Sequence, residues 1–214
     1  MMRFEPDMLL LYAVTDRAWV GKQTLYEQVE DALRGGVTCV QLREKNLDRD
    51  AFIDEAVQLR ELCHRYRVPL IINDNVDVAL KSGADGVHVG IEDCPVAEIR
   101  ARVGKDFIIG ATAKTVEQAR AAQAAGADYL GVGAVFPSPT KQTAIRITKE
   151  QLREICTCVQ IPAVAIGGIS YSNVSELRGG GMRGIAVVSA LFAAEDIQTS
   201  AEQLKQEALR AVTL

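Results

Sequence analysis

Short runs of β-branched and other apolar residues alternate along the chain with longer segments in which apolar positions recur at helical spacing. This alternation is typical of βαβ units, in which each helix connects two parallel strands. Eight strands are predicted, at residues 9–14, 38–42, 70–72, 86–89, 107–110, 129–132, 163–166 and 185–188. Helices are predicted between them, among others at residues 25–33, 49–66, 116–125, 149–158, 173–178 and 201–212.

Small residues mark the turns that lead from a predicted helix into the next strand. The sequence Gly-Ala-Asp occurs in two of these turns, at residues 83–85 and 126–128, and glycine there accommodates the left-handed backbone that stops a helix. Eight such units in 214 residues fit a single α/β domain, a (β/α)8 TIM barrel over residues 1–214. An open doubly wound sheet is the alternative, but no Gly-x-Gly-x-x-Gly follows the first strand, which disfavours a dinucleotide fold.

Composition narrows the classes of function. The chain has 24 Lys and Arg against 28 Asp and Glu, a net charge of −4, and so lacks the basic excess of proteins that track nucleic acid. We find neither a basic leader nor an apolar run long enough for a membrane span. A cytoplasmic protein without nucleic-acid or membrane partners is therefore expected.

Cysteine and histidine do not form a recognisable metal motif. The five cysteines, an odd number, are expected to be reduced thiols, and Cys156 and Cys158 to be small buried residues, since their spacing does not suit zinc. His64 and His88 are isolated in the sequence, which excludes a two-histidine motif. The chemistry is therefore expected to rest on other residues.

The second predicted strand runs into a cluster of charge. Because side chains alternate between the two faces of a strand, Gln41 and Arg43 are expected to point into the barrel mouth, with Lys45 just beyond. Two cations there favour an anionic ligand. The alternative is an internal ion pair, with Glu44 or with an aspartate of strand 3.

Two aspartates follow the next strands. Asp74 and Asp93 come after strands 3 and 4, so both are expected at the barrel mouth. Two carboxylates beside cations suit Mg²⁺ bound together with a diphosphate. The alternative is that each aspartate only caps the helix that follows it.

The last loops carry features of a second anion site. The loop after strand 6, residues 134–143, is the longest connection and contains Ser138, Thr140 and Lys141, which suit a phosphoryl group; an idle solvated loop is the alternative. Gly167 and Gly168 follow strand 7, and Ser189 follows strand 8. Glycines there allow backbone N–H groups to approach a phosphate, a recurrent feature of this fold.

These segments together resemble the thiamine phosphate synthase family over nearly the whole chain, from Leu11 to Ser189. The most specific parts of the resemblance are Gln41-Leu42-Arg43-Glu44-Lys45, Ile72-Asn73-Asp74, residues 86–93, residues 131–133 with the Thr140-Lys141 loop, and residues 165–169. Members of this family join a hydroxymethylpyrimidine diphosphate to a thiazole phosphate, by a reaction in which diphosphate leaves first and the thiazole nitrogen captures the resulting pyrimidine carbocation.

The resemblance implies a role for each matching residue. Arg43, Lys45 and Lys141 would act in catalysis by stabilising the leaving diphosphate, and Mg²⁺ would bind Asp74 and Asp93. The pyrimidine diphosphate would be held by Gln41, Leu42, Arg43, Glu44, Lys45, Asn73, Thr112 and Lys141. The thiazole phosphate would be held by Ser138, Pro139, Thr140, Gly168, Val188 and Ser189.

The sequence departs from the family pattern at four positions. Thr112 and Ser138 keep a hydroxyl in place of the usual serine and threonine, whereas Ile91 and Thr143 replace polar residues. One alternative is the related thiazole tautomerase, which uses a histidine soon after strand 5 where this chain has Lys114. A non-catalytic barrel that binds thiamine phosphates and regulates a partner is the other. The resemblance leaves open a homodimer and a carboxylated thiazole substrate.

Overall fold

The computed structural model describes residues 2–137 and 145–213, and its strands close into a parallel barrel in which each strand pairs with the next and β8 pairs with β1. The strands are β1 Leu11–Val14, β2 Cys39–Leu42, β3 Leu70–Asn73, β4 Gly86–Val89, β5 Ile108–Ala113, β6 Tyr129–Gly133, β7 Ala163–Ile166 and β8 Gly184–Val187. The predicted barrel is confirmed, and the open doubly wound sheet is excluded by the β1–β8 pairing.

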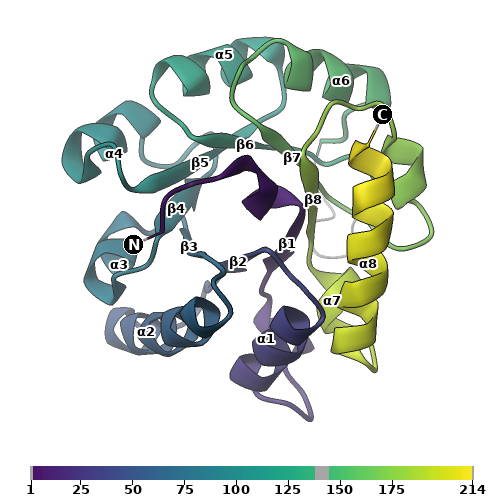
Figure 1. Ribbon diagram of the computed structural model, residues 1–214. Helices are drawn as coiled ribbons and strands as arrows, with labels where there is room; N and C mark the ends of the chain where they lie inside the picture. Colours follow the sequence, from purple (N-terminus) through teal and green to yellow (C-terminus); the bar gives the residue numbers. More distant parts are fainter. Residues whose placement is uncertain (1, 138–144, 214) are drawn as a thin grey trace.

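Helices surround the barrel as an outer layer (Figure 1). The α-helices are α1 Leu25–Arg34, α2 Arg49–Arg65, α3 Val76–Ser82, α4 Val96–Val103, α5 Val116–Ala124, α6 Lys149–Thr157, α7 Ser189–Phe192 and α8 Ile197–Val212. Short 3₁₀ turns are η1 Pro6–Leu9, η2 Arg17–Trp19 and η3 Val174–Leu177.

In every strand except β4, apolar side chains divide between two hydrophobic clusters, as the period of two in a strand requires. Alternate residues such as Tyr12, Cys39 and Tyr129 fill the inside of the barrel. Their neighbours, such as Val40 and Leu42, pack against the helices. The predicted division of strand 2, with Gln41 on the inner face, is therefore confirmed.

Several predicted boundaries differ from the structure, among them the following three. The first strand begins at Leu11 because Pro6–Leu9 form the 3₁₀ turn η1, with proline at the start of the turn. The helix predicted at 173–178 is the 3₁₀ turn η3, and the final helix begins earlier, at Ile197, where the Asp196 side chain accepts a hydrogen bond from the Thr199 amide.

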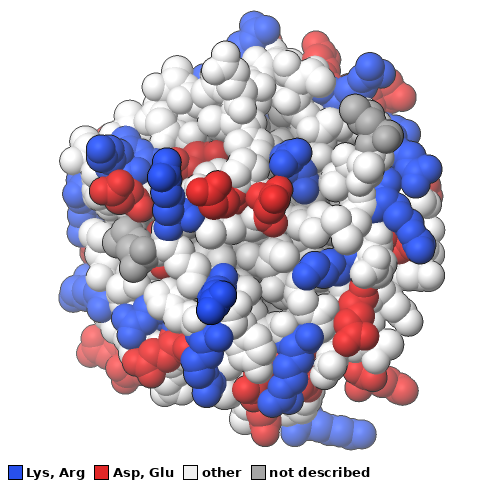
Figure 2. Space-filling model, in the orientation of Figure 1, with Lys and Arg blue, Asp and Glu red and all other residues white. Residues whose placement is uncertain are grey.

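The N-terminal segment closes the end of the barrel opposite the C-terminal ends of the strands, and crosses its opening in Figure 1. The buried Asp85 carboxylate accepts hydrogen bonds from the Met2 amide at 2.7 Å, the Leu70 amide at 3.0 Å and His64 Nε2 at 2.8 Å. Phe4 stacks on Tyr129, with ring centroids 5.8 Å apart. In the same orientation, Figure 2 shows basic and acidic side chains interspersed.

The cysteines follow the expectation in part. Cys39, Cys63 and Cys156 are buried and Cys158 is partly buried, whereas Cys94, in the loop after β4, is exposed. Burial raises the pKa of the Cys156 thiol to about 12, as expected for a thiol that packs as an apolar residue. Within the described ranges, no helix is both long and apolar enough to cross a membrane.

Candidate functional site

A cavity of about 350 Å³ lies at the C-terminal ends of the strands, where active sites of this fold form. Most of the predicted site residues that the structure describes line it together: Gln41, Arg43, Lys45, Asn73, Asp74, Asp93, Thr112, Gly168, Val188 and Ser189. Leu42 and Glu44 do not line it. Ser138, Pro139, Thr140 and Lys141, as well as Thr143, lie outside the described residues.

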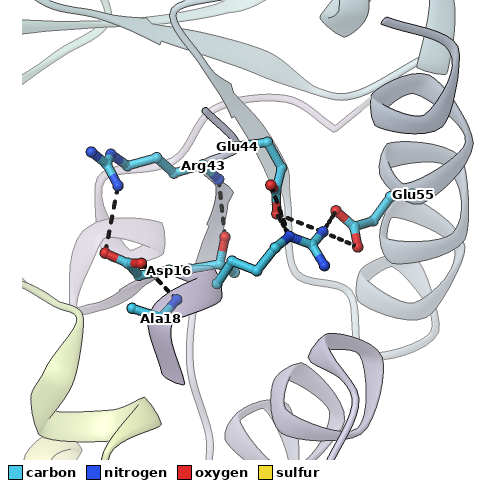
Figure 3. A network of polar contacts seen from close by, with 7 residues as sticks. Asp16, Ala18, Arg43, Glu44 and Glu55 are labelled. Atoms are coloured by element: carbon cyan, nitrogen blue, oxygen red, sulfur yellow. Dashed lines mark hydrogen bonds and ion pairs between the residues drawn. The ribbon is translucent and has the colours of Figure 1, made fainter. Parts of the chain in front are cut away.

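The Arg43 side chain lies at the cavity beside the loop that follows β1 (Figure 3). Its guanidinium is 3.5 Å from the Asp16 carboxylate, and its backbone amide donates to the Thr15 hydroxyl at 2.9 Å. The alternative of an ion pair between Arg43 and Glu44 is therefore wrong, because the Glu44 carboxylate contacts Arg17 instead. Arg43 is a third exposed, so an anion in the cavity can reach it.

Glu44 is buried and instead forms an ion pair with the partly exposed Arg17. The Glu44 side chain is 2% exposed and lies 2.8 Å from the Arg17 guanidinium, which also contacts Glu55 of α2 at 2.7 Å (Figure 3). Hydrogen bonds to Glu44 raise the pKa of Arg17, and burial raises the pKa of Glu55. This Arg17 bridge, formed by Glu44, Arg17 and Glu55, holds the end of β2 against α2.

Asp74 has an unusual backbone conformation for a non-glycine residue, with φ of 60°. Its carboxylate lies 2.8 Å from Lys45 Nζ and accepts a hydrogen bond from Asn73 Nδ2 at 2.7 Å. The alternative of an ion pair with an aspartate of strand 3 is therefore present for Lys45. The N-cap of α3 is Asn75, whose side chain accepts from the Val78 amide, so the capping interpretation of Asp74 is wrong.

Asp93 is also not a helix cap, because the N-cap of α4 is Pro95. Its carboxylate accepts a hydrogen bond from the Gly90 amide at 2.7 Å and lines the same cavity as Asp74. Over the described ranges, no three His, Cys, Asp or Glu side chains converge to hold a metal ion by themselves. Two carboxylates fit Mg²⁺, which completes its shell with water and phosphate oxygens.

Backbone rather than charge forms the opposite side of the cavity. Gly167 and Gly168 have φ of 103° and 64°, and a Cβ at Gly168 would lie 2.1 Å from the Pro137 carbonyl oxygen. The Asn173 side chain accepts from the Ser170 amide and donates to the Gly168 carbonyl, which braces this loop. Only glycine fits such a close approach of two loops.

A chain of hydrogen bonds crosses the inside of the barrel below the cavity. Gln41 Nε2 donates to the Tyr12 hydroxyl at 2.9 Å, and the hydroxyls of Tyr12 and Tyr129 are 2.8 Å apart. His88 then lies 3.1 Å from Tyr129 through Nδ1 and 3.1 Å from the Thr112 hydroxyl through Nε2. Burial raises the pKa of both tyrosines and lowers the pKa of His88 to about 4, so all three groups are neutral near pH 7.

Two glycines make room for this chain. A Cβ at Gly110 would lie 2.4 Å from the Tyr129 hydroxyl oxygen and 2.5 Å from His88 Nδ1, and a Cβ at Gly131 would lie 2.9 Å from His88 Cε1. The sequence did not single out His88 as a site residue, and the structure places it at the cavity. Its place between Val87 and Val89, which pack on the helices, is a signal in the sequence that it points inward.

A second hollow, of about 610 Å³, lies outside the barrel near α3 and α4 and shares Lys45, Asn73 and Asp74 with the cavity. Ile91 is 48% exposed and does not line the cavity. Lys114, the residue at the position where the tautomerase pattern has histidine, does line the cavity.

Comparisons with known proteins agree on one family. The family profile described as thiamine monophosphate synthase matches residues 11–191. A thiamine-phosphate synthase of Ruminiclostridium cellulolyticum is 49% identical over 91% of this chain and 92% of its own length. One of Methanobrevibacter smithii is 43% identical over 93% and 95%. The solved structure of a thiamine phosphate pyrophosphorylase from Pyrococcus furiosus has 39% identity and a TM-score of 0.90, covering 97% of this chain and 99% of that chain.

Proposed function

Because the chain belongs to the thiamine monophosphate synthase family, we propose that it is a transferase that joins 4-amino-5-hydroxymethyl-2-methylpyrimidine diphosphate to hydroxyethylthiazole phosphate, forming thiamine phosphate and diphosphate. One observation carries the proposal: the cations after β2 and the carboxylates after β3 and β4 share one cavity with the glycine loop after β7. One side of the cavity thus suits a leaving diphosphate, and the other suits a phosphate that stays attached.

The diphosphate is proposed to bind between Arg43, Lys45 and Thr112. In the cavity Lys45 is paired with Asp74, and Arg43 lies near Asp16. Each cation is therefore held in place, while about half of the Lys45 side chain and a third of the Arg43 side chain stay exposed. When diphosphate binds, the two cations contact its phosphoryl oxygens in place of, or in addition to, their present carboxylate partners. The planar guanidinium of Arg43 is well suited to such contacts. The thiazole phosphate is assigned to the backbone amides around Gly168, Val188 and Ser189.

Magnesium is proposed as the cofactor, with Asp74 and Asp93 as its protein ligands. When bound, it would neutralise charge that develops on the departing diphosphate. Lys45 and Asn73 keep the Asp74 carboxylate oriented in the cavity, through contacts of 2.8 and 2.7 Å. The Gly90 amide does the same for Asp93.

The proposed reaction needs no protein nucleophile. The bond between the pyrimidine methylene carbon and the diphosphate oxygen breaks, its electron pair leaves with diphosphate, and the thiazole nitrogen lone pair forms the new C–N bond. Arg43 and Lys45 stabilise the negative charge of the leaving group, and the glycine side of the cavity aligns the second substrate. Lys141, which lies outside the described residues, is proposed to help stabilise the same negative charge.

The two alternatives receive less support. The tautomerase interpretation requires a histidine after β5, where the cavity has Lys114. A regulatory barrel would tolerate the loss of the two carboxylates, Asp74 and Asp93, which both line this cavity. We further propose that the chain is one catalytic domain, acts on small molecules in the cytoplasm, and functions alone or as a homodimer.

The test is product formation by the purified full chain. With Mg²⁺ and both phosphorylated substrates, we expect release of one inorganic diphosphate for each thiamine phosphate formed. Omission of the thiazole phosphate is the control, because only hydrolysis could then release diphosphate. Absence of thiamine phosphate at saturating substrates would reject the synthase assignment.

A further inference from the structure

The hydrogen-bond chain Gln41–Tyr12–Tyr129–His88–Thr112, here called the buried relay, joins two residues on opposite sides of the cavity. Gln41 is on β2 and Thr112 on β5, and both line the cavity. The three residues between them carry hydroxyl and imidazole groups that each link two neighbours. The ends of the buried relay are therefore connected without any contact between them.

The direction of the hydrogen bonds follows from the donor at one end. Gln41 Nε2 can only donate, so the Tyr12 hydroxyl accepts there and passes its own proton towards Tyr129. Tyr129 in turn donates to His88 Nδ1. A neutral imidazole carries its proton on the other nitrogen, so His88 Nε2 donates to the Thr112 oxygen.

This direction decides what each end offers to a ligand. Thr112 accepts from His88, so its own hydroxyl proton is free to donate into the cavity. Gln41 uses Nε2 on Tyr12, and its Oε1 has no hydrogen-bond partner among the described residues. One end thus offers a donor and the other an acceptor.

Reversal of the buried relay exchanges both properties together. If Thr112 donates to His88, every bond reverses, and Gln41 must turn its amide so that Oε1 accepts from Tyr12. Thr112 then offers only lone pairs to the cavity, which repel a phosphoryl oxygen, and Gln41 offers only N–H groups. A partly reversed chain leaves a buried donor or acceptor unpaired, which is unfavourable.

We propose that Tyr12, Tyr129 and His88 are positioning residues that couple the two ends, so that a phosphoryl group on the Thr112 hydroxyl orients the Gln41 carbonyl oxygen towards an amino group of the same ligand. The inference rests on the proposed function, since an aminopyrimidine diphosphate carries one group of each kind. It adds a means by which the enzyme selects an amino donor only when the diphosphate is in place.

The test measures binding of two fragments to the full chain by calorimetry: inorganic diphosphate with Mg²⁺, and the uncharged 4-amino-5-hydroxymethyl-2-methylpyrimidine. We expect diphosphate to tighten binding of the pyrimidine by about fivefold or more, the lower end of common coupling between sites. The pyrimidine should tighten diphosphate binding by the same factor. An analogue with hydrogen in place of the amino group should show no such effect.

Tyr129→Phe removes one hydroxyl from the buried relay and keeps the ring. We expect it to bind each fragment alone but to lose the coupling, and to raise the KM for the pyrimidine diphosphate while leaving that for the thiazole phosphate unchanged. Tyr12→Phe breaks a second link of the buried relay and should have the same effects as Tyr129→Phe. The coupling can therefore still be tested if one of the two variants fails to fold. Tyr66→Phe is the matched control, because it removes a hydroxyl that contacts Glu30 outside the barrel.

Coupling that persists in both Tyr129→Phe and Tyr12→Phe would overturn the proposal, as would fragments that bind independently to the wild type. Failure of both fragments to bind the folded wild type would instead reject the proposed function, and the buried relay's role with it. The two failures are therefore distinguishable.

Discussion

At the scale of single residues, Asp74 combines a rare backbone conformation with a carboxylate at the cavity. Its φ of 60° lies in the left-handed region, which asparagine and aspartate adopt more readily than alanine does. The turn that places Asp74 between Asn73 and the N-cap Asn75 therefore restricts which substitutions it tolerates.

Two substitutions separate these roles. Asp74→Asn should keep the free energy of unfolding near that of the wild type, whereas Asp74→Ala should lower it by about 1 kcal/mol because of the left-handed backbone. Both should lose Mg²⁺-dependent diphosphate binding. Urea unfolding and calorimetry on the same samples measure the two effects, and equal stabilities of the two variants would contradict the backbone argument.

Asp93 offers a test of the division between the two sides of the cavity. Asp93→Ala should raise the Mg²⁺ concentration needed for half-maximal activity about tenfold or more, since a ligand carboxylate is lost. It should leave the KM for thiazole phosphate nearly unchanged. Asp93→Asn is the matched variant that retains an acceptor for the Gly90 amide, and a parallel loss of both substrates would point to a disrupted barrel mouth instead.

Single residues also show what the sequence could and could not predict. Alternation along strand 2 correctly placed Gln41 and Arg43 at the cavity, because a strand's period of two is local information. The partners of those residues depend on which loops meet in space. Thus Asp16 rather than Glu44 lies by Arg43, and Gln41 reaches Tyr12.

At the scale of elements, the Arg17 bridge holds the end of β2 to α2. Glu44 lies between Arg43 and Lys45 in the sequence but faces away from the cavity, and it is nearly completely buried. Its contact with Arg17 thereby restricts the backbone from which both cations project. We infer that Glu44 supports the site without contacting substrate. This differs from the resemblance, which implies that Glu44 binds the pyrimidine diphosphate.

Arg17→Met should lower the free energy of unfolding by about 2 kcal/mol, because Glu44 is left as an unpaired buried charge. The Arg17→Met/Glu44→Gln double variant should recover part of that loss, since the uncompensated charge is gone. A double-mutant cycle by urea unfolding measures the coupling. Additive losses in the double variant would show that the bridge contributes no interaction energy of its own.

Element positions were predictable to the extent that their signals are local. Strands 4 and 7 have the predicted bounds, because glycine or a buried apolar run delimits them. The capping interpretation failed at Asp74 and Asp93 since the competing caps, Asn75 and Pro95, are one or two residues away. Sequence spacing alone does not decide which of several adjacent residues begins a helix.

At the scale of the whole molecule, the two ends of the barrel have different tasks. The C-terminal ends of the strands carry the cavity, and the opposite end is closed by the N-terminal segment on Asp85. Residues at that closed end are expected to contribute to stability rather than catalysis. The closure of eight strands was predictable from their number and spacing, whereas the Asp85 contacts join residues far apart in the sequence.

Asp85→Ala should lower the free energy of unfolding by about 3 kcal/mol, because it removes a buried carboxylate with three donors. Both KM values should stay near those of the wild type at a temperature where the variant is folded. Asp85→Asn, which keeps one acceptor oxygen, should lose less stability. A changed KM in the folded variant would show that the closed end influences the cavity.

The turn η2 contains a residue whose fluorescence can report binding at the cavity. It begins directly after Asp16, which caps it through the Ala18 amide at 3.0 Å, and it contains Trp19, the chain's one tryptophan. We expect that an anion that draws Arg43 from Asp16 shifts this turn and changes the fluorescence of the Trp19 indole ring. Intrinsic fluorescence in a stopped-flow instrument should therefore follow diphosphate arrival in real time, without a dye or label.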